Sequence, residues 1–171
     1  MKEIQKQKIL QQEQAKYISK NTDKTNKIIL RRVLFTLLKL LVLFIIGGIT
    51  YIVIEILFRG HSHISMFFLG GLCFTIIGGI NNYIPWELGL IQQMTIGSIT
   101  ITILEYITGY IVNIKLGWNV WDYSDRLFNV NGQVCLLFSI IWLFISLLAI
   151  LLDDWLRYKL FNEEKPHYKI V

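Results

Sequence analysis

The hydrophobic positions of this chain gather into four long runs separated by short polar segments. The runs cover residues 33–57, 64–84, 94–116 and 134–152. Each is close to the ~20 residues that a helix needs to cross the hydrocarbon core of a bilayer. Backbone polar groups in lipid must pair within their own segment, so the pattern predicts an all-α membrane protein with four transmembrane helices.

Composition agrees with this pattern, because 54% of the 171 residues are hydrophobic and only 17% are charged. A chain of this kind is too apolar for an ordinary soluble domain. The four runs define a transmembrane domain over residues 33–152, and the first run is too long and too far from the start to be a signal peptide. The segment 1–32 is a basic leader, helical or disordered, and residues 153–171 form a tail.

Positive charge indicates the orientation of the helices. Nine of the 17 Lys and Arg residues lie in the leader, four lie in the tail, and the segment around Pro85 has none. Cytoplasmic segments carry an excess of Lys and Arg, so we expect both termini in the cytoplasm. The leader's cations would meet anionic lipid headgroups, and the alternative is a docking site for a cytoplasmic partner.

An internal repeat is visible at a spacing of fifty positions. Residues 46–55 read IGGITYIVIE and residues 96–105 read IGSITITILE, with Ile, Gly, Ile, Thr and Glu in common. Further on, GGLC at 70–73 and GQVC at 132–135 each place Gly three residues before Cys. Two crossings return a chain to the same side of the membrane. The pattern therefore predicts two parallel two-helix repeats, related by an axis along the membrane normal.

Two acidic residues fall within these runs. Glu105 lies at the middle of the third run, where a carboxylate costs ~2.5–3.5 kcal/mol on insertion scales. It is either a protonated structural acid, hydrogen-bonded to a Thr, Asn or Tyr of another helix, or a functional group. Glu55 could form an ordinary i,i+4 pair with Arg59. The repeat places both acids at equivalent positions, so we predict that Glu55 and Glu105 are paired elements of one internal polar site approached from the outer face.

The predicted outer loop, residues 117–135, is unusually rich in aromatic and polar side chains. Trp121 and Tyr123 are amphipathic rings of the kind that collect at headgroup level. Between and after them, Asp122 and Ser124 match an Asp-x-Ser turn that satisfies its own backbone. Anchoring rings and a local turn thus explain part of the loop.

The amides of Asn129 and Asn131 need another explanation. We hypothesise that residues 118–133 form an ordered outer cap, in which Asp122 and both asparagines turn inward to hydrogen-bond the ends of the helices. This arrangement would place the polar side chains of the loop against the transmembrane domain.

The histidines and cysteines of the chain give weaker indications of function. His61 and His63 alternate on a short turn, but two ligands without a third make a weak metal site, so we expect a solvated turn. Cys73 and Cys135 lie in or beside hydrophobic runs, which predicts free buried thiols.

Two further carboxylates, Asp153 and Asp154, fall at the predicted end of the last helix. The helix macrodipole disfavours anions at that position. We expect Arg157 and Lys159 to neutralise them.

Residues 104–142 contain three motifs that resemble those of a known family. Leu-Glu-Tyr at 104–106, Trp-Asp-Tyr-Ser at 121–124 and Asn-x-Asn-Gly at 129–132 resemble the motifs of the bacterial CmpB-like family of ABC-transporter type IV permeases. The first half resembles it less, because Arg59-Gly60 and Gly70-Gly71 match but the family's prolines are missing. The resemblance implies a permease-like subunit in a bacterial cell membrane, with a separate ATP-binding subunit and assembly as a homo-oligomer. The chain itself has no G-x-x-x-x-G-K-[ST] loop.

Three classes of function follow: a permease-like subunit of unknown substrate, a membrane enzyme acting on a lipid-linked substrate, and a structural or regulatory partner of another membrane protein. We favour the first, and expect the lipid bilayer as a partner but no nucleic acid, cofactor or metal. No catalytic residue is assigned. The candidate substrate-binding residues are Glu105, Glu55, Tyr106, Trp121, Asp122, Tyr123, Ser124, Asn129 and Asn131.

Overall fold

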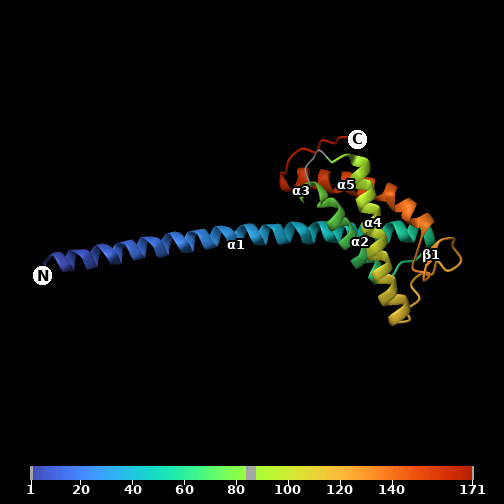
Figure 1. The fold of residues 1–171 in the computed structure, drawn as a ribbon, viewed down its shortest axis with the longest axis horizontal. Coiled ribbons are helices and arrows are strands. Elements are labelled where there is room, and N and C mark those ends of the chain that lie inside the picture. Colours follow the sequence, from blue (N-terminus) through green and yellow to red (C-terminus); the bar gives the residue numbers. More distant parts are fainter. Residues whose placement is uncertain (1, 84–87, 171) are drawn as a thin grey trace. The chain divides into compact units, whose positions relative to one another are not determined.

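The computed structural model describes residues 2–83 and 88–170, and these are mostly helical (Figure 1). A short two-stranded hairpin lies in the loop before the last helix. The elements are α1 (Lys2–Arg59), α2 (Ile64–Gly78), α3 (Ile80–Tyr83), α4 (Leu90–Gly109), the π-helix η1 (Tyr110–Lys115), β1 (Asn129–Val130), β2 (Val134–Cys135) and α5 (Leu136–Phe161).

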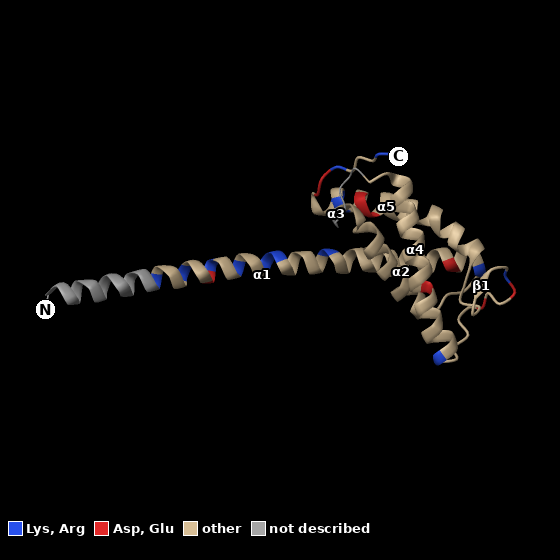
Figure 2. Ribbon diagram, viewed as in Figure 1, with Lys and Arg blue, Asp and Glu red and all other residues tan. Residues whose placement is uncertain are grey.

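The chain divides into two units, Met1–Lys39 and Leu40–Val171. In the first unit the leader is helical, and α1 begins at Lys2 rather than at residue 33. This segment contains no Gly or Pro and is rich in Lys and Gln, which are good helix formers. Its residues 16–38 are exposed, and Lys and Arg recur along it (Figure 2).

In the second unit, residues 40–59 of α1 run antiparallel to α2. A Cβ added to Gly47 would lie 2.3 Å from the Cβ of Phe74, and one added to Gly70 would lie 2.3 Å from the Cβ of Tyr51. Small residues let two membrane helices approach this closely. The two helices therefore depend on glycine at their line of contact.

The helices α4 and α5 form a second antiparallel pair. A Cβ added to Gly97 would lie 2.7 Å from Ser146, and Ser98 Oγ donates a 2.6 Å hydrogen bond to the carbonyl of Ser139. Gly97 is the repeat equivalent of Gly47, and each faces the next helix of its own pair. The second repeat match fails, because residues 70–73 lie inside α2 whereas residues 132–135 form a turn and β2 before α5.

The chain passes between two ends of this unit. At the first, which we call the loop end, the α1–α2 turn meets the loop before α5, and the rings of His63 and Trp118 lie 5.3 Å apart. At the opposite end, the tail end, the backbone N–H of Leu90 donates a 2.7 Å hydrogen bond to the carbonyl of Lys169. Residues 40–59 of α1, then α2, α4 and α5, connect these ends in turn.

Within the described residues, three helices are long and apolar enough to cross a membrane: Lys16–Arg59, Leu90–Lys115 and Leu136–Phe161. The predicted second span, 64–84, is divided, because α2 has only 15 residues and ends at Gly78. Glycine is a poor helix former, and two glycines follow one another here. Residue 84 lies outside the described part.

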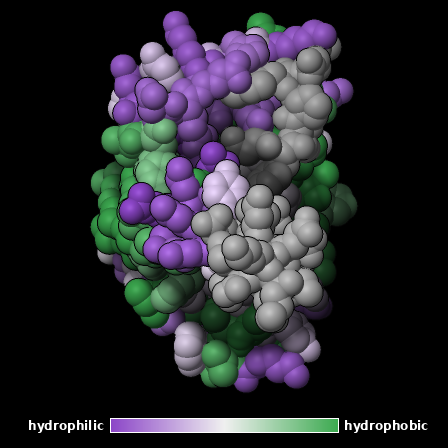
Figure 3. Space-filling model, turned by 90° about the vertical axis from the view of Figure 1, so that its left-hand side faces the viewer, coloured by the Kyte–Doolittle hydropathy of each residue, from purple (hydrophilic) through white to green (hydrophobic). Residues whose placement is uncertain are grey.

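The surfaces of the long helices are hydrophobic, as expected for contact with lipid. On α4, Ile99, Ile103 and Ile107 recur every fourth position and are exposed. Ile140, Phe144 and Leu148 form a similar exposed row on α5. Hydrophobic side chains cover the flanks of the molecule in Figure 3. Rows of large exposed apolar residues are unusual for a soluble surface and typical of one that faces acyl chains.

The last helix continues beyond its predicted end at residue 152, and Asp153 and Asp154 are buried within it. Arg157 forms an ion pair with Asp153, as expected. The expected role of Lys159 is wrong, because its ammonium lies 5.3 Å from the ring centroid of Tyr158. The helix continues because both carboxylates have partners, a guanidinium for Asp153 and neutral hydrogen-bond donors for Asp154.

Those partners for Asp154 come from two other segments. Its Oδ2 accepts a 2.7 Å hydrogen bond from Asn81 Nδ2 and a 3.0 Å bond from the Tyr168 hydroxyl. Burial, and then the charge of Asp154, raise the pKa of the Tyr168 phenol well above its ordinary value. The phenol is therefore protonated at neutral pH and donates to Asp154. This bond attaches the segment after α5 to the tail end of the unit.

Candidate functional site

Glu105 lies in the interior of the second unit, with a side chain that is 1% exposed. Trp142 of α5 donates its indole N–H to Oε2 at 2.7 Å, and the Tyr123 hydroxyl donates to Oε1 at 3.2 Å. A hydrogen bond to a charged acceptor contributes about 1.5–3 kcal/mol, so two such donors offset the insertion cost of one carboxylate. Among the described residues, no Lys or Arg forms an ion pair with Glu105.

Tyr123 reaches Glu105 from the loop. Its ring stacks on Phe138 at 4.6 Å between centroids, so the phenol is held in place. Burial raises the pKa of the Tyr123 phenol well above its ordinary value, and the nearby Glu105 raises it further. Tyr123 therefore stays protonated and acts as a donor, rather than lying at headgroup level as an anchoring ring.

A cavity of about 60 Å³ lies beside Glu105, among α1, α2, α4 and α5. Most of its lining is apolar. Besides Glu105, the polar and aromatic residues of the lining are Thr50, Tyr51, Cys73, Phe74 and Trp142. A carboxylate that lines an apolar cavity inside a membrane protein is a candidate functional group.

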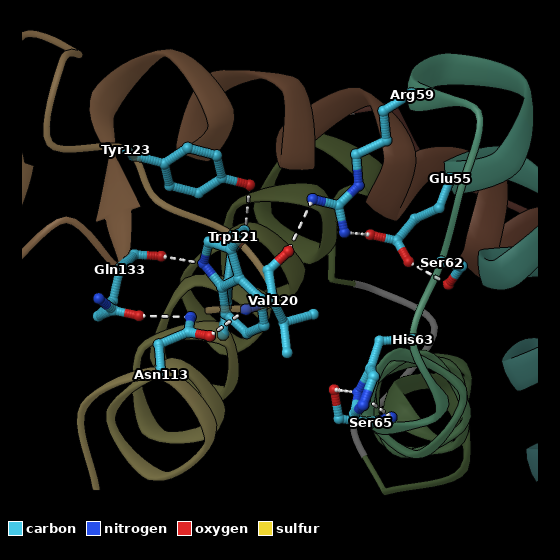
Figure 4. Close-up of polar contacts among 11 residues, drawn as sticks. Glu55, Arg59, Ser62, His63, Ser65, Asn113, Val120, Trp121, Tyr123 and Gln133 are labelled. Carbon is cyan, nitrogen blue, oxygen red and sulfur yellow. Dashed lines mark hydrogen bonds and ion pairs between the residues drawn. The ribbon is translucent and has the colours of Figure 1, made fainter. Parts of the chain in front are cut away.

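Glu55 has a separate set of partners. It is buried, forms the expected ion pair with Arg59, and accepts a hydrogen bond from Ser62 Oγ (Figure 4). Arg59 also donates from Nη1 to the carbonyl of Val120 at 3.3 Å. The pair thus fixes the loop to α1, and within the described residues Glu55 shares no hydrogen-bond partner with Glu105.

The loop is held to the helices by two amides (Figure 4). Asn113 donates to Gln133 Oε1 at 2.8 Å, and its own Oδ1 accepts the N–H of Val120 at 2.7 Å. Trp121 donates its indole N–H to the carbonyl of Gln133 at 2.9 Å. Trp121 is only 6% exposed, so it too is a buried residue rather than an anchoring ring.

The π-helix η1 accounts for the position of Asn113. A π-turn changes the direction of the side chains that follow it, and such turns occur often at functional sites. Asn113 and Val112 are buried in η1. Asn113, Gln133 and Trp142 are absent from the predicted site, although an amide inside an apolar run is a signal that could have identified Asn113.

Asp122 and Ser124 form the local turn that their spacing predicts. Asp122 Oδ1 accepts hydrogen bonds from Ser124 N at 2.8 Å and from Ser124 Oγ at 2.6 Å. These bonds, the side-chain one first, lower the pKa of the exposed Asp122 carboxyl. The expectation that Asp122 bonds to a helix end is therefore wrong.

The two asparagines differ in their roles. Asn129 donates to the carbonyl of Arg126 at 2.8 Å and accepts the N–H of Gly132 at 3.0 Å, so it orders the loop from within. Asn131 Nδ2 reaches α4, where it lies 3.0 Å from the Tyr106 hydroxyl. Both Asn131 and Gly132 have positive φ, at 52° and 67°, and they make the tight turn between β1 and β2.

Of the nine predicted site residues, the structure brings Glu105 together with Tyr123, and Tyr106 together with Asn131. Trp121 is buried in the loop network. The others bond elsewhere, within the loop or to Arg59.

Long apolar helices, an interior carboxylate and an ordered polar loop define a helical membrane protein. A family model described as "Putative ABC-transporter type IV" matches residues 24–169, and the chain belongs to this family. Neither the curated proteins nor the solved structures contain a match to the chain.

Proposed function

We propose that the chain is a permease-like subunit of an ABC transporter, and that Glu105 is a polar group within its transport pathway. The observation that carries this proposal is a buried carboxylate, without a basic partner in the described part, that lines a cavity among four helices. Although Glu105 is only 1% exposed and bonded to Trp142 and Tyr123, it also belongs to the lining of that cavity, which a purely structural acid would not require.

The membrane arrangement that we propose has both termini in the cytoplasm of a bacterial cell and the loop end outside. Lys and Arg are concentrated in the leader and the tail, as the positive-inside rule requires. The α2 segment provides the fourth, short crossing, so that α1–α2 and α4–α5 are two parallel repeats. ATP hydrolysis would come from a separate subunit, and a homo-oligomer would complete a pathway that four helices are too few to enclose.

Cys73 offers a direct test, because its thiol belongs to the lining of the cavity. In a Cys135→Ser background it is the remaining thiol of the chain. We expect the methylmercury cation, which is small enough for a cavity of this size, to modify Cys73 about tenfold faster than it does when Glu105→Gln is added to this background, since a carboxylate raises the local concentration of cations. Mass spectrometry of the intact protein in lipid nanodiscs measures both rates.

Two variants distinguish an effect of the cavity carboxylate from an effect of surface charge. Asp125→Asn, which neutralises an exposed loop carboxylate, should leave the rate unchanged, whereas Glu105→Gln should lower it. If the cation does not modify Cys73 in the folded protein but does so after denaturation, the cavity is closed to water and the pathway proposal is wrong.

A further inference from the structure

The walls of the Glu105 cavity combine aromatic rings with one carboxylate. Phe74 of α2, Tyr51 of α1 and Trp142 of α5 all belong to its lining. The rings of Tyr51 and Trp142 lie 6.1 Å apart between centroids, with 34° between their planes. Aromatic rings near one another attract an organic cation through their negative faces, and this grouping is typical of sites for alkylated ammonium ions.

The charges around the cavity favour a positive occupant. Glu105 has two neutral donors and no basic partner within the described residues. Arg59, the guanidinium at the loop end, is bound to Glu55 and to the carbonyl of Val120. An anion would meet the carboxylate without compensation, whereas a cation would supply the charge that the site lacks.

The size and polarity of the cavity narrow the class of cation. Its volume of about 60 Å³ is well below the ~150 Å³ of an engineered cavity that holds benzene, so only a few non-hydrogen atoms fit. Much of the remaining wall is aliphatic, with Leu69, Ile77 and Ile101 among its residues. A metal ion prefers several oxygen ligands and would find one carboxylate here. An ammonium ion with a methyl substituent can instead place its charge at the carboxylate and its methyl group against the apolar wall.

We propose that this cavity binds a small alkylammonium ion of about methylammonium size, with its charge at Glu105 and its methyl group against the aromatic rings. The inference rests on the proposed function and names the substrate class of the same site. It adds that Tyr51 and Phe74 are binding residues, which the sequence motifs do not indicate.

Thermal unfolding of the full chain in nanodiscs tests the proposal. Methylammonium chloride is titrated against sodium chloride at equal ionic strength. A ligand present at ten times its dissociation constant should raise the unfolding midpoint by roughly 3–6 °C. Tetramethylammonium, which is too large for the cavity, should give no more than the sodium control. An equal rise with all three salts would be a salt effect and would overturn the proposal.

Two variants and one protection measurement distinguish this binding from other causes. Glu105→Gln should abolish the methylammonium shift, Tyr51→Leu should weaken binding about threefold or more, and Asp125→Asn should change neither. Methylammonium at ten times its dissociation constant should slow the modification of Cys73 about tenfold. A shift that persists in Glu105→Gln would place the ligand elsewhere.

The two proposals fail in different ways. If Cys73 reacts in a Glu105-dependent manner but methylammonium gives neither a shift nor protection, the pathway stands and the alkylammonium proposal is wrong. If Cys73 is unreactive while methylammonium still stabilises the chain through Glu105, the site binds the ion but the open pathway is wrong.

Discussion

Replacing Gly78 by alanine is expected to destabilise the protein by about 3 kcal/mol or more. A Cβ at this position would lie 2.0 Å from the Cγ and 2.4 Å from the Cβ of Asp153. Asp153 cannot turn away, because it is fully buried and paired with Arg157. Separating α2 and α5 costs ~1–3 kcal/mol as overpacking, and the displaced Asp153 also weakens its buried ion pair, whose loss costs ~3–5 kcal/mol. The midpoint of thermal unfolding in detergent should fall by roughly 6–12 °C.

A second glycine provides the matched control. Gly117 has a φ of 67° and no atom within 4 Å of an added Cβ, so its requirement is conformational rather than steric. Asparagine tolerates this conformation better than other residues, and Gly117→Asn should shift the midpoint by at most a few degrees. A Gly78→Ala variant as stable as the Gly117→Asn variant would contradict the close packing of α2 on α5.

The helices were predictable because a helix that faces lipid requires a long run of apolar residues, which is easily recognised in a sequence. Long runs of Ile, Leu and Phe identify α4 and α5 directly. The ends were less predictable, since they depend on contacts between distant segments. Asp153 and Asp154 resemble a helix end in sequence, but Arg157, Asn81 and Tyr168 compensate them inside α5. Likewise, nothing next to Gly78 in the sequence indicates that Asp153 packs against it.

The site shows the same division between local and distant contacts. The turn of Asp122 with Ser124 is confirmed, because both partners lie within three residues. Glu105 stands out since a carboxylate in the middle of an apolar run is rare. Its donor Trp142 lies 37 positions away and looks like any other aromatic residue of a membrane helix. The inward position of Trp121 depends on Gln133 in the same way.

Replacing Trp142 by phenylalanine is expected to lower the free energy of unfolding by about 3 kcal/mol. The change removes the 2.7 Å hydrogen bond to Glu105 Oε2 and leaves that buried oxygen with no other donor among the described residues. A bond to a charged acceptor contributes about 1.5–3 kcal/mol, and the lost volume of the indole adds to this by enlarging the cavity. The thermal midpoint in nanodiscs, measured by circular dichroism, should fall accordingly.

The same substitution at Trp118 is the control, because that residue is 52% exposed and its loss should cost less than about 1 kcal/mol. A double-mutant cycle then isolates the bond from the loss of volume. When Glu105 is glutamine, the acceptor is neutral, so Trp142→Phe should be milder by about 1–2 kcal/mol than in the parent. Equal costs in the two backgrounds would mean that Trp142 acts only by packing. In that case the carboxylate would be stabilised by Tyr123 alone, and Trp142 would have no part in orienting Glu105 toward the cavity.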